Sequence, residues 1–74
     1  MSVDKYSCLH FSLSRKVDEA EPALAITALL RSLAGYLEEI DGLTDDGIKD
    51  IVIRPEIDID GDTDLIATVY YSLD

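Results

Sequence analysis

The chain has 74 residues, of which 47% are hydrophobic and 30% are charged, and its formal net charge is −10. This length supports one small domain, residues 1–74, with a modest core, and the hydrophobic fraction is too high for a disordered chain. The excess of acidic side chains makes direct binding to nucleic acid or to anionic lipid the least expected function, because both carry the same sign of charge.

Cys8 is the only cysteine, which excludes an internal disulfide and is typical of a reducing compartment. The first residues contain no apolar run of signal-peptide length, and no segment approaches the roughly 18 apolar residues that span a membrane. We therefore expect a cytoplasmic protein, bacterial or viral by its size.

The first predicted strand covers residues 5–13, where Leu9, Phe11 and Leu13 lie on one face. Alternation with a period of two is typical of a half-buried strand. After a polar exit at residues 14–16, a helix is expected.

The predicted helix covers residues 23–40, where apolar side chains recur at helical spacing. Asp18 and Glu21 have the spacing of a capping box at its start; alternatively, Glu21 precedes Pro22 at the first helical position. Gly42 predicts the end of the helix.

The second half predicts two strands joined by a turn. Isoleucines at positions 51, 53, 57 and 59 alternate with other residues, and Asp60-Gly61 is a strong hairpin signal. The last strand alternates from Leu65 to Leu73. Together with the first strand and the helix, this order predicts an α+β fold, a two-layer βαββ domain with one long helix on one face of a three-stranded sheet.

A right-handed crossover after the first strand makes the first two strands parallel and leaves the third between them, so the expected order is 1-3-2. Pro55 agrees with this order, because proline belongs in an edge strand. The side chains expected on the inner face, against the helix, are Leu9, Phe11, Leu13, Ile51, Ile53, Ile57, Ile59, Leu65, Ala67, Val69 and Tyr71.

The outer face of the predicted sheet carries a mixed apolar and aromatic patch, and the helix has more apolar surface than one sheet needs. Chains this short often gain burial by association. We therefore expect a homodimer, formed through the edge of the first strand or through the outer sheet face. The residues expected to mediate self-association are Tyr6, His10, Ile66 and Tyr70.

Residues 38–64 hold eleven of the sixteen acidic residues against Lys49 and Arg54, a local charge of about −9. Close-set carboxylates repel each other, so a cluster kept at that cost suggests a basic partner. Glu38, Glu39 and Asp41 at the helix C-terminus also oppose the helix dipole, which favours a functional role for the cluster. The residues expected to contact a partner are Asp45, Asp46, Asp50, Glu56, Asp58, Asp60, Asp62 and Asp64.

Alternate strand residues point the same way, so Glu56 and Asp58 are expected about 6.6 Å apart, close to the spacing of phosphates along a nucleic acid strand. By size and charge this resembles the small acidic phage proteins that mimic DNA to block restriction or CRISPR complexes. The expected function is therefore a protein-binding module, an inhibitor of the anti-restriction or anti-CRISPR type that occupies a basic groove.

The same acidic stretch also partly matches a calcium-binding loop, with Glu56, Asp58, Asp60 and Gly61 at ligand and turn positions. Ala67 stands where a bidentate Glu is required, and the flanking segments are predicted strands instead of helices. Weak divalent-cation binding is one alternative function, and an Asp-rich soluble turn is the simplest explanation.

No pattern predicts an enzyme. His10 shares its face with Cys8 and Ser12, too few ligands for zinc, so we expect no metal site and no cofactor. The glycines are isolated and no serine has a base at a motif spacing. A structural subunit that completes a larger assembly is the other alternative function.

Overall fold

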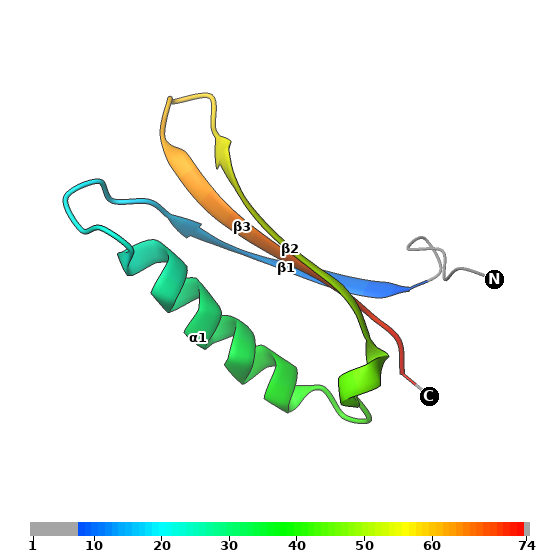
Figure 1. The fold of residues 1–74 in the computed structure, drawn as a ribbon. Helices are drawn as coiled ribbons and strands as arrows, with labels where there is room; N and C mark the ends of the chain where they lie inside the picture. Colours follow the sequence, from blue (N-terminus) through cyan, green and yellow to red (C-terminus); the bar gives the residue numbers. More distant parts are fainter. Residues whose placement is uncertain (1–7, 74) are drawn as a thin grey trace.

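The computed structural model describes residues 8–73. Its elements in chain order are β1 (Leu9–Lys16), α1 (Leu24–Glu39), the 3-10 helix η2 (Asp45–Gly47), β2 (Ile48–Ile57) and β3 (Thr63–Tyr71). The strands form one sheet in the order β1-β3-β2, with β3 antiparallel to both neighbours, and α1 lies on one face of it (Figure 1). The predicted α+β fold with one long helix and the order 1-3-2 is confirmed.

The register assigns the two faces of the sheet. Val69 of β3 pairs with Phe11 of β1 and Ile51 of β2, and Ala67 in the same way pairs with Leu13 and Ile53. Because Val69 and Ala67 are fully buried, these rows form the face that meets α1. Pro55 lies in β2, an edge strand, where its missing N–H costs no ladder bond to a further strand.

The core is small. Among the described residues, the hydrophobic side chains that are buried are Ala25, Leu29 and Leu33 of α1 and Ala67 and Val69 of β3. The three helix residues follow each other at intervals of four and so form one row along α1.

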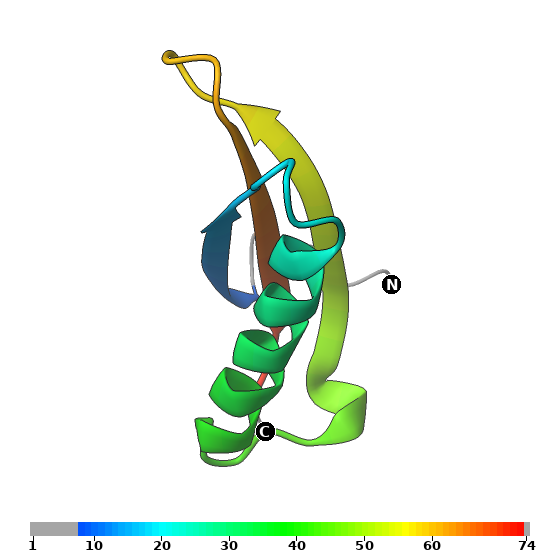
Figure 2. The same cartoon turned by 90° about the vertical axis from the view of Figure 1, so that its left-hand side faces the viewer.

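An aromatic contact sets the lateral position of the helix. Phe11 of β1 lies with its ring centroid 6.3 Å from Tyr36 of α1 and 6.0 Å from Tyr71 of β3. These contacts hold α1 over β1 and β3, while β2 runs along one side of it (Figure 2). The inner face of β2 is therefore only partly covered.

The start of the helix differs from the prediction. Asp18 accepts a hydrogen bond from the N–H of Ala20 at 3.0 Å and so organises a turn instead of capping α1. The helix begins at Leu24, after Ala23 in the left-handed region at φ 64°, so Pro22 is not its first residue. Both predicted starts were wrong: the Asp18 side chain is used by its own turn, and the left-handed Ala23 separates Pro22 from the helix.

The helix ends at Glu39 with Ile40 as an extended C-cap, so Gly42 does not cap it as predicted. Gly42, at φ 82°, instead lies in the turn in which the Leu43 N–H donates to the Ile40 carbonyl at 3.4 Å.

The end of β2 also differs. Ile57 and Ile59 were expected on the inner face, but β2 ends at Ile57, which is 76% exposed, and Ile59 lies in the turn and is fully exposed. The reason is that the Asp58 carboxylate accepts the N–H groups of Asp60 and Asp62, which closes the hairpin two residues early.

Candidate functional site

The end of the β2–β3 hairpin projects beyond α1 (Figure 1, top). The Asp58 N–H donates to the Asp62 carbonyl at 2.8 Å, and Asp58 Oδ1 accepts the N–H groups of Asp60 at 2.9 Å and Asp62 at 3.0 Å. Gly61 supplies the left-handed residue at φ 85°. The turn is thus tied to one carboxylate, and five acidic side chains follow its outline. We call this region the hairpin end: Glu56, Ile57, Asp58, Ile59, Asp60, Asp62 and Asp64.

Two cations offset part of the charge of the hairpin end. Lys16 Nζ lies 3.2 Å from Asp62 Oδ2, and Arg54 lies 3.2 Å from Glu56 Oε1. The hydrogen bond and the charge of Asp62 raise the pKa of Lys16, and Asp58 and Asp64 add smaller effects in the same direction. Five carboxylates against two cations leave a local charge of −3, so the surface stays acidic but is less repulsive than the sequence suggests.

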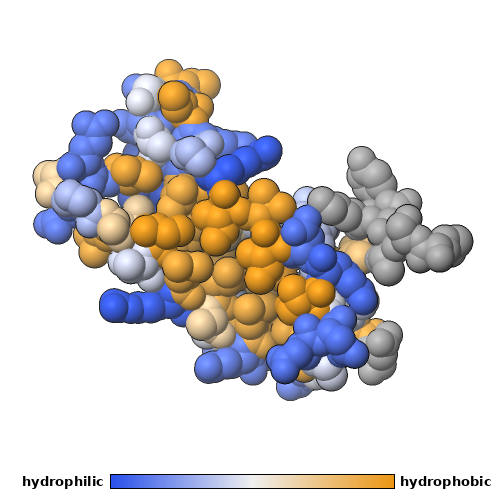
Figure 3. Space-filling view, in the orientation of Figure 1, coloured by the Kyte–Doolittle hydropathy of each residue, from blue (hydrophilic) through white to orange (hydrophobic). Residues whose placement is uncertain are grey.

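The hairpin end also presents two isoleucines that were expected on the inner face of the sheet. Ile59 is fully exposed and Ile57 is 76% exposed. Figure 3 shows apolar surface at the top of the molecule, where the hairpin lies in Figure 1. A signal was available in the sequence, since Ile59 stands between two aspartates next to Gly61, which is turn composition.

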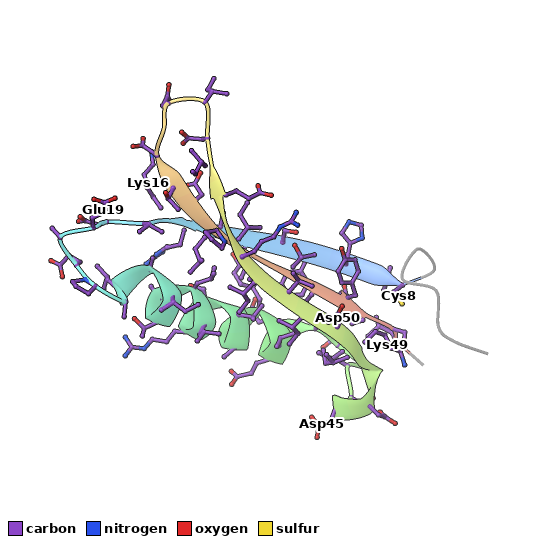
Figure 4. All side chains as sticks on the ribbon, turned by 45° about the horizontal axis from the view of Figure 1, so that its top comes forward. Cys8, Lys16, Glu19, Asp45, Lys49 and Asp50 are labelled. Carbon is purple, nitrogen blue, oxygen red and sulfur yellow. The ribbon has the colours of Figure 1, made fainter. Side chains whose placement is uncertain are left out.

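The structure does not bring all predicted contact residues together. Asp45 and Asp46 lie in η2 and Asp50 lies near the start of β2, whereas the other five lie at the hairpin end. The ten residues of β2 span about 30 Å between these two regions. Figure 4 shows Asp45, Lys49 and Asp50 at the opposite end of the molecule from Lys16.

The expected row of carboxylates at phosphate spacing is also absent from the described residues. Glu56 is in β2, but Asp58 lies outside the strand and its carboxylate faces its own turn. Glu56 instead lies directly opposite Asp64 of β3, and Asp64 in turn lies opposite Lys16 of β1.

A second acidic group surrounds the C-terminus of α1. We call it the distal group: Glu38, Glu39, Asp41, Asp45 and Asp46. The hydroxyl of Thr44 donates to Asp46 Oδ1 at 2.6 Å and lowers the pKa of Asp46, with a further contribution from its own backbone and a smaller one from the charge of Lys49. No basic residue lies in the last turn of α1, so the helix dipole is uncompensated there.

The outer sheet face carries most of the predicted self-association residues. His10 and Tyr70 pair across β1 and β3 with ring centroids 5.9 Å apart, and Ser12 and Thr68 share a hydrogen bond of 2.8 Å beside them. Ile66 lines a shallow hollow of about 250 Å³ with Val52, Arg54, Thr68 and Tyr70. Tyr6 lies outside the described residues. Polar and charged side chains interrupt this face.

Within residues 8–73, no three His, Cys, Asp or Glu side chains are grouped so that they could hold a metal ion. The described helices include none with the length and apolar character needed to cross a membrane. No polar or charged side chain in this range is buried. The carboxylates of the hairpin end are therefore in contact with solvent and accessible to a partner.

Comparison of the chain with protein-family models, with curated proteins and with solved structures finds no match.

Proposed function

We propose that this protein is a small acidic binding module of the cytoplasm, not an enzyme, and that it contacts its partner through the hairpin end. One observation carries the proposal: a projecting, internally bonded turn presents exposed Ile59 within a group of carboxylates. An apolar centre within a polar rim is the usual anatomy of a protein interface.

The proposed partner presents a basic surface with an apolar pocket. The charge of −3 at the hairpin end would guide the encounter, and Ile59 would be buried on contact. In its finer form the proposal is inhibition of a nucleic-acid-binding complex, of the restriction or CRISPR type, by occupation of its basic groove. The separation of the two acidic regions restricts this contact to the hairpin end instead of the whole acidic segment.

The test is capture of partners from host lysate by the immobilised protein and by two variants of equal charge. The hairpin variant carries Glu56→Gln, Asp60→Asn and Asp64→Asn, and it leaves Asp58 and Asp62 to hold the turn. The distal variant carries Glu38→Gln, Glu39→Gln and Asp45→Asn. The proposal predicts that the hairpin variant loses the partner and the distal variant retains it. Loss by the distal variant alone would overturn it.

Competition by duplex DNA tests the finer form. If the partner uses its nucleic-acid groove, added duplex DNA should release it from the immobilised protein. A partner that binds the protein and DNA simultaneously would exclude the inhibitor role but not the binding module. Ile59→Ser, which leaves the charge unchanged, should also weaken capture.

A second candidate role, a subunit that associates into a homodimer or larger assembly, is favoured by the small core. The described residues bury only five hydrophobic side chains, while large apolar side chains of α1 and β2 remain exposed. Chains of this size commonly obtain the missing burial from another chain.

A further inference from the structure

The flank of α1 that faces away from β1 is apolar and open. The buried row of α1 consists of Ala25, Leu29 and Leu33. Tyr36 contacts Phe11 of β1, so the side of this row on which Tyr36 lies faces β1. The row on the other side lies next to β2. Its members are Ile26, Leu30, Ala34 and Leu37, each at least partly exposed.

The inner face of β2 continues this apolar surface. Ile51, Ile53 and Pro55 pair with the inward residues of β3, and Ile57 extends the row to the hairpin. All four are also at least partly exposed. We call these eight residues the α1–β2 face: Ile26, Leu30, Ala34 and Leu37 with Ile51, Ile53, Pro55 and Ile57.

The α1–β2 face contains no charged residue, although the chain carries a net charge of −10. Figure 3 shows an extended apolar area on this side of the molecule, over α1 and β2. Contiguous apolar surface of this kind on a soluble chain marks an interaction site. The outer sheet face, by contrast, places Lys16, Arg54, Glu56 and Asp64 among its apolar residues.

The exposed fractions indicate how much of this face is open to a partner: Leu30 is 46%, Ile51 42% and Ile57 76% exposed. The described residues bury only five hydrophobic side chains. Chains this short commonly gain the missing burial from another copy of the same chain.

We infer that the α1–β2 face is the surface through which two copies of this chain associate. The face offers both halves of a self-complementary contact, a bare helix flank and a bare strand face. In a two-fold pair, α1 of each copy covers β2 of the other, so both bare surfaces are buried simultaneously. This interface deepens the assembly role proposed above and does not involve the carboxylates that would bind a basic partner.

The decisive experiment is the mass of the purified protein in solution, measured by sedimentation equilibrium from micromolar to millimolar concentration. A dimer is expected, and Leu30→Lys or Ile51→Lys should weaken association by about tenfold or more because each places a charge in the buried contact. The matched control is Leu24→Lys. Leu24 is 53% exposed on a different side of the same helix, against 46% for Leu30, and the charge change is identical.

A lysine also lowers the repulsion between two acidic chains, so dissociation by Leu30→Lys cannot result from net charge. Helical circular dichroism confirms that each variant is folded. Ile57→Lys provides a variant at a position exposed enough to tolerate the change without unfolding. A parent protein that remains monomeric throughout would overturn the inference, and so would equal dissociation by Leu24→Lys.

Tyr70→Ala distinguishes the two sheet faces. It should leave the dimer intact under this inference, whereas dissociation by Tyr70→Ala without an effect of Leu30→Lys would assign the contact to the outer face. The salt dependence of association distinguishes this dimer from the partner binding proposed for the hairpin end. Dimerisation of two acidic chains should strengthen with added salt, while binding of a basic partner should weaken.

Discussion

Glu56 and Asp64 lie directly opposite one another in the β2–β3 ladder, so two carboxylates face each other next to the hairpin turn. Like charges at opposed strand positions destabilise a sheet. Arg54 beside Glu56 and Lys16 opposite Asp64 limit this cost. The hairpin end therefore retains charge that its own folding does not require, which agrees with the proposed role in binding a partner.

This opposition should be measurable as a coupling energy. In a double-mutant cycle with Glu56→Gln and Asp64→Asn, we expect an unfavourable interaction of about 0.2–1 kcal/mol between the parent side chains. Urea denaturation at low salt measures it, and added salt should reduce it. A favourable coupling would mean that the cations overcompensate the repulsion.

The contact between Lys16 and Asp62 predicts a pH dependence on the alkaline side. The pKa of folded Lys16 is raised, first by its hydrogen bond to Asp62. Its contribution to stability is therefore complete below the unfolded pKa of about 10.4 and is lost as the pH rises through the higher folded value. Lys16→Gln should be less stable than the parent at pH 7, and the difference should disappear at high pH. A constant difference would contradict the assignment.

The contact between Thr44 and Asp46 predicts the opposite dependence at acid pH. The hydroxyl of Thr44 lowers the pKa of folded Asp46, so the contribution is present above the unfolded pKa of about 3.9 and is lost as the pH falls through the lowered value. Thr44→Val should raise the pKa of Asp46, as followed by NMR titration, and should reduce stability near neutral pH. Thr44→Ser keeps the donor and should restore both.

Replacement by alanine should have opposite effects on stability at two glycines, Gly35 and Gly47. Gly35 lies in α1 with nothing near the position of an added Cβ, so Gly35→Ala should stabilise the protein by about 0.8–1 kcal/mol. At Gly47 the Cβ would lie 2.7 Å from the Ser72 carbonyl oxygen, and the N–H of Ser72 donates to the Gly47 carbonyl. Gly47→Ala should destabilise by about 1–3 kcal/mol. Thermal melts of both variants compare them, and an equal shift would contradict this packing.

The sequence predicted the elements that depend on periodicity and on chain topology. The helical spacing of α1, the alternation in β3, the strand order and the edge position of Pro55 agree with the structure. The bounds of the first strand do not: β1 continues through residues 14–16, which were expected as a polar exit, because they pair with residues 64–66 of β3. The predicted residues 5–7 of this strand lie outside the described residues. The lateral position of α1 was not predictable, because it depends on a contact between Phe11 and Tyr36, which are far apart in the chain. That position is what leaves the inner face of β2 open.

The candidate site was predicted less well, because residues that are near in the acidic segment are not near in space. The acidic segment includes all of β2, and an extended strand of ten residues separates its two ends by about 30 Å. The exposed position of Ile59 also depends on side-chain chemistry: the Asp58 carboxylate ends the strand by taking two backbone N–H groups.

The central claim, that the hairpin end binds a basic partner, is tested most directly by the dissociation constant of the captured partner as a function of salt. The parent and the distal variant should bind equally, with affinity that falls steeply as salt is added. The hairpin variant should bind more weakly and with a flatter salt dependence, because three of the contributing charges are gone. Equal binding and equal salt dependence of the hairpin variant and the parent would contradict the claim.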